Sequence, residues 1–391
     1  MKYAHYLLIL IILAAVMISA GCVAKSGTEI PSIAGPWTEA SSIVHQNGDE
    51  GFTYPALTNG IFDVTFQEGR LFSGTFAGTD FHGSFYTKDG TQFILINDIS
   101  ETEQPISEIL IGTIVSDNEI RISGVTFQNT NNGSVFEEST SGARSFTLVR
   151  NGAALQPPKY PDVLGMWEFD NGSVTSRITT IPISGGDLIV QGQEEALFYG
   201  IIDTGSQTGP IGYTNFSAVM YGGNKIKNLL FITDEGQLWF GTILAGEISL
   251  ASIDDKTSES TVNILTQTYR RDHTVNYTLP VFPDVTGIWS TKQQEVISEN
   301  GYDTGLPSDF IISADIQDHN CFIGSTSYMG VNEGEIGGIV STTGEVTLFK
   351  YNKNGGIYLA MGQIDEDTLD LSEIFTEAGI TYVSRILTVR T

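Results

Sequence analysis

The sequence has little of several features that would point to a known class of protein. It has only two cysteines, Cys22 and Cys321, among 391 residues, so we expect no framework of intrachain disulfides. It has 19 lysine and arginine residues against 46 aspartate and glutamate residues, giving a formal net charge of −27. Such a surface repels the phosphates of nucleic acids, and no cluster of basic residues offsets it. We therefore expect no nucleic-acid partner.

Sequence signatures of catalysis are also missing. The chain contains no Gly-x-Ser-x-Gly, phosphate-binding glycine loop, His-Glu-x-x-His or Cys-x-x-Cys motif. His319 and Cys321 are spaced to share one face of a strand, but a buried cysteine beside a surface histidine is commoner than a metal or redox pair. The acidic run at 365–367 lacks the later glycine and glutamate of a calcium-binding loop. We expect no enzyme activity, no cofactor and no metal site.

After the N-terminal segment the chain has no long apolar run and no clear helical periodicity. Within that segment, Lys2 precedes an apolar stretch at 6–18, and Ser19-Ala20-Gly21-Cys22 follows it. Small residues before a cysteine resemble a prokaryotic lipobox, although Ser19 departs from the commoner leucine or valine. We expect residues 1–22 to be a signal peptide that ends in lipid attachment at Cys22. The alternative is an uncleaved membrane anchor.

Both alternatives attach the protein to the outer face of the cytoplasmic membrane, so the membrane is the first expected partner. Residues 23–30 are polar and predict a short flexible tether. The remainder has no apolar run of the roughly 20 residues needed to span a bilayer as a helix. We predict that it folds outside the cytoplasm.

What the sequence does contain is a threefold repeat. Each copy has a proline, then a Gly-x-Trp, a Phe-x-Gly, an apolar-Gly-x-Ile landmark and a closing arginine, in the same order. The three Gly-x-Trp stretches are Gly35-Pro36-Trp37, Gly165-Met166-Trp167 and Gly287-Ile288-Trp289. The spacing predicts three domains, at 31–150, 157–271 and 279–391. Proline-containing connectors predict semi-stiff spacers between units with separate cores.

The periodicity within each copy is that of β-strands. Residues 61–66 alternate apolar and polar side chains, and the turn at 67–70 leads into a second strand. Further hairpin turns are expected at 88–90 and 116–118. We predict an all-β protein.

The tryptophan and the arginine of each copy suit the closure of a barrel. A tryptophan on the first strand can plug one end of the barrel, and an arginine on the last strand can lie against its indole ring. The glycine two residues earlier, lacking a Cβ, would allow the neighbouring backbone to approach closely. The expected pairs are Trp37 with Arg150, Trp167 with Arg270, and Trp289 with Arg390.

This combination resembles the signature of the calycins, the group that includes lipocalins, fatty-acid-binding proteins and avidins. The resemblance covers all three copies and implies three tandem antiparallel, eight-stranded calycin-like β-barrels. The distance of about 100 residues from tryptophan to arginine is nearer to avidin-like barrels than to the longer lipocalins. A sandwich with an aromatic core residue at a strand start is the alternative. Biotin binding is not expected, because the polar cluster at 171–173 is not shared by the other copies.

Four Asn-x-Ser/Thr sequons, at Asn132, Asn171, Asn215 and Asn276, are possible N-glycosylation sites. Two functions remain open. One is a non-catalytic cell-surface lipoprotein that acts as a spacer or as an interaction module with a surface protein partner. The other is a surface-tethered protein that binds a small apolar or amphipathic ligand inside its barrels. Alternation alone cannot decide between them, because it does not show which face of a strand is interior.

Overall fold

The computed structural model describes residues 30–391 except for short segments. Those segments are 56–60, 88–89, 99–105, 129–140, 151–154, 156–158, 204–211, 223–226, 235, 245, 255–262, 273–280, 299–300, 305–308, 319, 352–356 and 378–379. Every regular element in the described ranges is a β-strand, which confirms the all-β prediction. Within these ranges no helix is long and apolar enough to cross a membrane.

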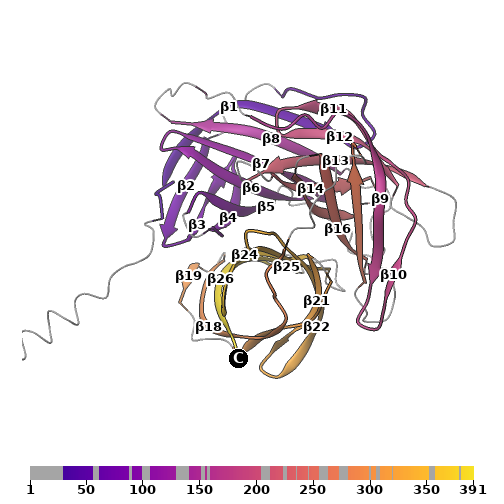
Figure 1. The fold of residues 1–391 in the computed structure, drawn as a ribbon. Coiled ribbons are helices and arrows are strands. Elements are labelled where there is room, and N and C mark those ends of the chain that lie inside the picture. Colours follow the sequence, from indigo (N-terminus) through magenta and orange to yellow (C-terminus); the bar gives the residue numbers. More distant parts are fainter. Residues whose placement is uncertain are drawn as a thin grey trace, which may run out of the picture.

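The strands form three sheets in chain order (Figure 1). Barrel 1 contains β1 (Gly35–Gln46), β2 (Ile61–Glu68), β3 (Leu71–Phe76), β4 (Thr79–Phe85), β5 (Gln92–Asp98), β6 (Ile106–Ser116), β7 (Glu119–Gln128) and β8 (Gly142–Val149). Barrel 2 contains β9 (Gly165–Thr175), β10 (Thr180–Pro182), β11 (Leu188–Glu194), β12 (Leu197–Asp203), β13 (Tyr213–Tyr221), β14 (Lys227–Thr233), β15 (Leu238–Leu244), β16 (Glu247–Asp254) and β17 (Asn263–Arg270). Barrel 3 contains β18 (Gly287–Ser298), β19 (Gly301–Asp303), β20 (Phe310–Asp318), β21 (Cys321–Tyr328), β22 (Val331–Val340), β23 (Glu345–Tyr351), β24 (Ile357–Asp365), β25 (Thr368–Glu377) and β26 (Ile380–Arg390).

Each sheet is closed by antiparallel pairing of its first and last long strands: β1 with β8, β9 with β17, and β18 with β26. In barrels 2 and 3 the short strands β10 and β19 pair with the far half of the first strand and add a hairpin to it. The eight remaining strands of each sheet form the barrel itself. The prediction of three tandem, closed, eight-stranded antiparallel barrels is therefore confirmed.

The Phe-x-Gly landmark marks a bulge that all three barrels share. The second barrel strand has an irregular register opposite Gly74, Gly200 and Gly324. A Cβ on these glycines would lie 1.8–1.9 Å from a backbone carbonyl oxygen of the bulged strand. Since no side chain fits at that distance, glycine is required where the sheet bends toward closure.

Large side chains fill the described part of each barrel interior. Barrel 1 contains a cluster of aromatic rings in which Trp37, Phe72 and Phe93 are each at most 2% exposed. The corresponding clusters of barrels 2 and 3 surround Trp167 and Trp289. Phe72 stacks edge-on against Phe93 with ring centroids 5.1 Å apart, a favourable aromatic geometry.

A further buried apolar cluster lies between the barrels rather than inside them. This central cluster takes side chains from the outer faces of all three barrels and packs them against one another. Its members include Leu71 and Ile94 of barrel 1, Leu197 and Leu230 of barrel 2, and Leu359 and Ile374 of barrel 3. Each barrel keeps an interior cluster of its own, as expected, but the barrels also share this central cluster and are not independent units. The predicted semi-stiff connectors lie mostly outside the described residues. The outward apolar residues of the strands are buried against neighbouring barrels.

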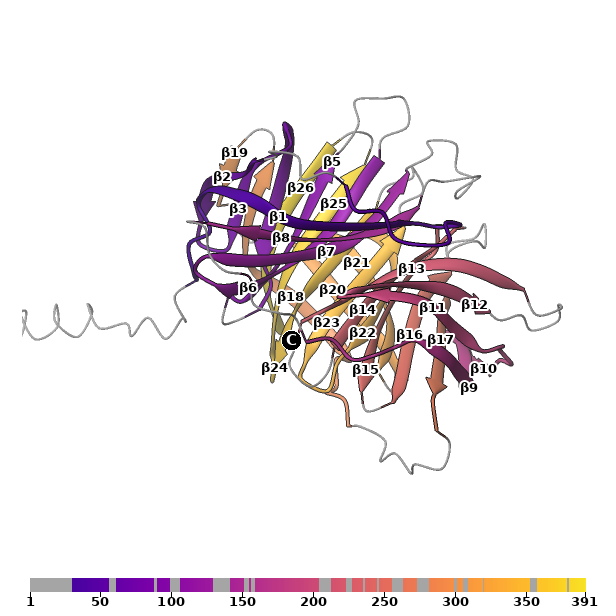
Figure 2. The same ribbon diagram turned by 90° about the horizontal axis from the view of Figure 1, so that it is seen from above.

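The three barrels contact one another in a cyclic order. The seventh and eighth strands of barrel 1, β7 and β8, pack on β12 and β13 of barrel 2. In the same way β17 packs on β21 of barrel 3, and β25 and β26 pack on β3 and β4 of barrel 1. Figures 1 and 2 show the result, with barrel 3, in orange and yellow, set against both other barrels. Head-to-tail contacts of this kind form a closed ring.

Polar contacts reinforce each step of the ring. Between barrels 1 and 2, His45 Nδ1 lies 2.6 Å from Ser217 Oγ, and its ring stacks on Tyr199 at 4.0 Å. Burial lowers the pKa of His45, while the backbone and carboxylate of Asp49 oppose that shift. Between barrels 2 and 3, Arg177 forms ion pairs with two carboxylates of barrel 3, and between barrels 3 and 1 Ser372 bonds to Ser84 at 2.7 Å.

Candidate functional site

The tryptophan of each Gly-x-Trp closes one end of its barrel. Its indole Nε1 donates a hydrogen bond to the carbonyl four residues earlier, in the segment that enters the barrel. The donors and acceptors are Trp37 to Ile33 at 2.8 Å, Trp167 to Val163 at 2.8 Å, and Trp289 to Val285 at 2.9 Å. All three tryptophans are at most 2% exposed, so this bond satisfies a buried donor. The same local geometry recurs in every copy.

A guanidinium group lies over each of these indole rings. Arg150 lies 3.7 Å from the ring centroid of Trp37, and Arg390 lies 4.7 Å from that of Trp289. Arg150 also donates to the carbonyl of Ala34 at 2.7 Å, and Arg390 donates to that of Asp284 at 2.5 Å. These contacts tie the last strand of each barrel to the segment entering its first strand.

In barrel 2 the expected arginine is wrong by one residue. Arg271, not Arg270, lies over Trp167 at 4.4 Å and donates to the Leu164 carbonyl at 2.5 Å. Tyr269 points into the barrel, so Arg271 shares its side of the strand whereas Arg270 points outward. Arg270 instead forms ion pairs with carboxylates of β16 and β9, at 3.1 and 3.3 Å.

The proposed reason for the glycine of Gly-x-Trp also needs correction. A Cβ on Gly35 or Gly165 would meet no atom within 4 Å, so close approach of another backbone is not the cause there. All three glycines have positive φ, at 95°, 101° and 126° for Gly35, Gly165 and Gly287. Only glycine adopts this region at little cost, and the entering chain requires it to turn into the strand.

A glutamine in each copy was missed by the sequence analysis. Its side-chain amide bonds to the entering segment twice, accepting from one backbone N–H and donating to one carbonyl. In barrel 2, Gln193 accepts from Val163 N at 2.7 Å and donates to the Pro161 carbonyl at 2.9 Å. Gln67 and Gln317 make the same pair of bonds in barrels 1 and 3. The signal was present, since each glutamine lies five positions before the phenylalanine of Phe-x-Gly.

Replacing Gln193 by alanine is expected to lower the free energy of unfolding by roughly 1–3 kcal/mol, because a half-buried N–H and a carbonyl lose their partner. The neighbouring Gln191 is exposed at the bulge between Val190 and Gly192, so Gln191→Ala is a control on the same strand with an expected effect near zero. Urea unfolding followed by circular dichroism measures both. Equal effects of the two substitutions would contradict the structural role of Gln193.

The barrel interiors also contain buried polar groups, but they differ from copy to copy. Barrel 1 has Arg144 near Glu108 at 3.3 Å, and barrel 2 has Tyr269 donating to Gln267 at 2.7 Å. In barrel 3, Tyr358 donates to Glu373 at 2.5 Å. Burial raises the pKa of Glu373, and its hydrogen bonds from Ser384 and Tyr358 oppose that shift. No acid, base or ligand set recurs at equivalent positions among these described groups.

The remaining candidate residues fall into two groups. Cys22, Asn132, Asn276 and His319 lie outside the described residues. Of the rest, Asn171 is exposed on β9, whereas Asn215 is half-buried and donates to Asp234 at 2.9 Å. Cys321 is buried, and burial raises the pKa of its thiol, so it is not a reactive cysteine.

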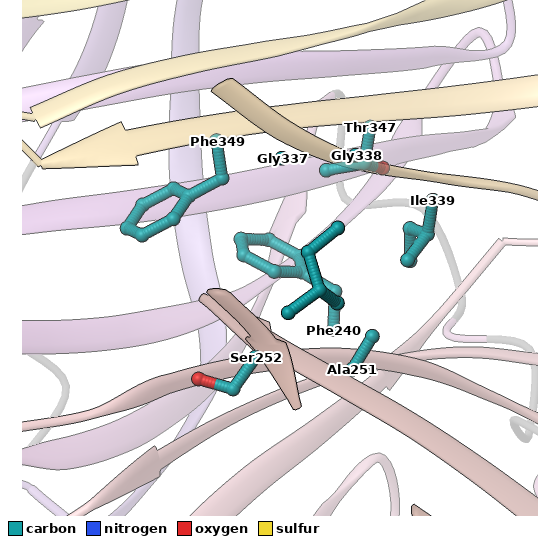
Figure 3. A pocket seen from close by; sticks show the side chains of 9 residues that line it. Phe240, Ala251, Ser252, Gly337, Gly338, Ile339, Thr347 and Phe349 are labelled. Atoms are coloured by element: carbon teal, nitrogen blue, oxygen red, sulfur yellow. The ribbon is translucent and has the colours of Figure 1, made fainter. Parts of the chain in front are cut away.

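The described residues contain no group of three or more side chains suited to hold a metal ion. The acidic run at 365–367 lies in the exposed turn between β24 and β25. A cavity of about 10 Å³ lies between barrels 2 and 3, next to Phe240, Ala251 and Phe349 (Figure 3). A space of this size holds about one water molecule, so it is no ligand site.

Comparison with known proteins does not place the chain in a family. No family model matches it, and no curated protein matches it. Among solved structures it is similar to a protein of unknown function from the DUF3598 family of Nostoc punctiforme. That match has 11% identity and a TM-score of 0.25, and it covers 59% of this chain and 96% of the other.

A second similar structure is a mutant of the vaccine antigen transferrin binding protein B from Haemophilus parasuis. It has 10% identity and a TM-score of 0.19, and the match covers 92% of this chain and 76% of the other. TM-scores this low carry no argument about family or function. The chain is therefore described by its own geometry, as a module of three β-barrels.

Proposed function

We propose that this protein is a non-catalytic interaction module, held by lipid at Cys22 on the outer face of the cytoplasmic membrane. The observation that carries the proposal is the filling of the barrels. Aromatic and aliphatic side chains occupy the described interior of all three copies, and the recurring residues are those that close a sheet. A partner would therefore bind to the outer surface.

The packing of the barrels also favours an interaction module over a spacer. A spacer gains its length from domains placed end to end, whereas the central cluster draws all three barrels together. A compact ring of barrels instead offers a rigid surface with fixed relative positions for its loops and strands. The strong negative charge favours a basic partner.

The competing function, ligand binding inside a barrel, is tested by tryptophan fluorescence. All four tryptophans are at most 2% exposed and lie in the interior clusters, so a molecule entering a barrel changes their emission. We expect no saturable change when the apolar probe cis-parinaric acid is added to the purified protein. If the tryptophan emission changes and saturates at about one probe molecule per protein, the protein is a ligand carrier and the interaction module is refuted.

Anchoring is tested through the two cysteines. With a radioactive palmitate label, we expect the label to remain on the wild-type protein and on Cys321→Ser, and to be lost from Cys22→Ser. Cys321 is the matched control because its buried thiol cannot accept an acyl chain without unfolding. Label on Cys22→Ser, or a mature chain that retains residues 1–21, would contradict lipid attachment at Cys22.

A further inference from the structure

Three apolar side chains lie next to one another on the outer face of barrel 2. Met166 on β9 pairs in register with Ile189 on β11, and Ile189 pairs in register with Ile201 on β12. Their chain neighbours Trp167, Leu188 and Ile202 belong to the barrel interior, so these three point outward. We call Met166, Ile189 and Ile201 the apolar stripe. Met166 is 54% exposed, and the two isoleucines are half-buried.

The other two barrels serve as internal comparisons for the same positions. In barrel 1 the corresponding register is Pro36, Asp63 and Thr75. In barrel 3 it is Ile288, Ser313 and Ser325. The fold therefore accepts polar residues at the second and third positions. Closing the barrel does not explain the two isoleucines of barrel 2, and another cause is needed.

The stripe lies next to Tyr199, which stacks on His45 of barrel 1, but outside the central cluster. The central cluster draws on the neighbouring outward residue Leu197 of β12, but on none of the three stripe residues. Figure 1 shows β11 and β12 on the side of barrel 2 away from barrel 3. The apolar stripe thus lies on the outer face of barrel 2, with Met166 exposed and the two isoleucines half-buried, and apolar side chains gathered on an outer face indicate a binding surface.

Acidic side chains border the stripe. Glu168 and Asp162 are exposed on the same edge, and Asp187 accepts a hydrogen bond from the Phe169 backbone at 3.2 Å, beside Glu168. The two nearby arginines are engaged, Arg270 in ion pairs and Arg271 over Trp167. The border is therefore net negative, like the whole chain. It repels anionic lipid headgroups and a second copy of this chain, and attracts lysine and arginine.

We propose that the apolar stripe is the site where the interaction module binds a basic protein segment, one that presents apolar side chains between lysines or arginines. The apolar side chains of the partner cover Met166, Ile189 and Ile201, and its cations face Glu168, Asp162 and Asp187. This assignment rests on the interaction function proposed above, and it names the surface and the partner chemistry.

A synthetic peptide of alternating isoleucine and lysine, with a fluorescent label, is the probe. Fluorescence anisotropy with the full-length protein measures its affinity, and a peptide of alternating isoleucine and glutamate is the charge control. We expect the basic peptide to bind and the acidic peptide not to bind. Ile189→Ser with Ile201→Ser, which installs the barrel 3 residues, is expected to weaken binding at least about tenfold. Ile288→Ser, at the barrel 3 position equivalent to Met166, is the matched control and should leave affinity unchanged.

Two outcomes would overturn the site. Equal affinity of the double variant and the wild type would show that the basic peptide binds only to diffuse negative charge. Stronger binding to vesicles of anionic lipid than to the peptide would assign the stripe to a membrane. Met166→Ser alone, at an exposed position, gives the same test if the double variant unfolds. A failure here leaves the fluorescence test of the barrel interiors unaffected, so the two proposals can fail separately.

Discussion

Replacing Leu230 by alanine is expected to lower the free energy of unfolding by about 2–5 kcal/mol, as for other buried leucines. Leu230 points away from the interior of barrel 2 into the central cluster, and it is 0% exposed. The substitution leaves a cavity where three barrels meet. The loss should appear as a shift of one cooperative transition, because the barrels share this core.

Leu229, the adjacent residue on β14, provides the matched comparison. It is equally buried but points into barrel 2, so Leu229→Ala removes the same atoms from the barrel interior. Scanning calorimetry of both variants gives the calorimetric and van't Hoff enthalpies. We expect the two variants to lose similar amounts of unfolding free energy, and we expect the ratio of calorimetric to van't Hoff enthalpy to stay near one for both. If the barrels were independent, Leu230 would be a surface residue, and Leu230→Ala would change stability little while Leu229→Ala melted one barrel early.

Replacing Trp167 by alanine is expected to cost about 3–5 kcal/mol, as for other buried tryptophans. The substitution removes the ring that closes the end of barrel 2, the hydrogen bond to the Val163 carbonyl and the surface on which Arg271 lies. Urea unfolding followed by circular dichroism measures the loss. Trp167→Phe keeps most of the apolar contact and should cost less.

The two neighbouring arginines refine this test. In the Trp167→Ala background, Arg271→Ala should have a smaller effect than in the wild type, because its partner ring is already gone. Arg270→Ala should have the same effect in both backgrounds, since its ion pairs with Asp170 and Glu247 do not involve the indole. If the effect of Arg270→Ala, and not that of Arg271→Ala, depended on the presence of Trp167, the contact between Trp167 and Arg271 would be contradicted.

Much of the fold follows from short-range properties of the sequence. Alternation along β2 and the recurrence of Gly-x-Trp and Phe-x-Gly predict strands, turns and a threefold repeat. These features recur because each copy must meet the same local packing and hydrogen-bonding requirements. A tryptophan needs an acceptor four residues away, and a bulge needs glycine opposite it. Such requirements depend on neighbouring residues and can be read from spacing.

Strand alternation fixes which arginine closes each barrel end. The closing arginine must lie on the inward side of its strand, which Tyr269 sets for Arg271 and Leu148 sets for Arg150. The glutamine of each copy also kept a fixed distance from Phe-x-Gly. Its bonds to the entering segment cross about 30 residues of chain, so its role appeared only when the strands were placed in register.

The sequence by itself determined the repeat and the strand content, because these depend on alternation and spacing within one copy. Closed barrels were implied by the resemblance, with a sandwich as the alternative, and the pairing of first and last strands decided for closure. Only the tertiary structure decided that the barrels form a ring around a shared core. Continuous apolar runs such as residues 93–96 and 229–232 indicate strands covered on both faces, but they do not name what covers the outer one. The covering surface belongs to another copy more than 100 residues away, for example Phe349 against Phe240. A hydrophobic contact is non-directional, so packing alone decides which outward faces are buried between barrels and which, like the apolar stripe, stay outside the central cluster.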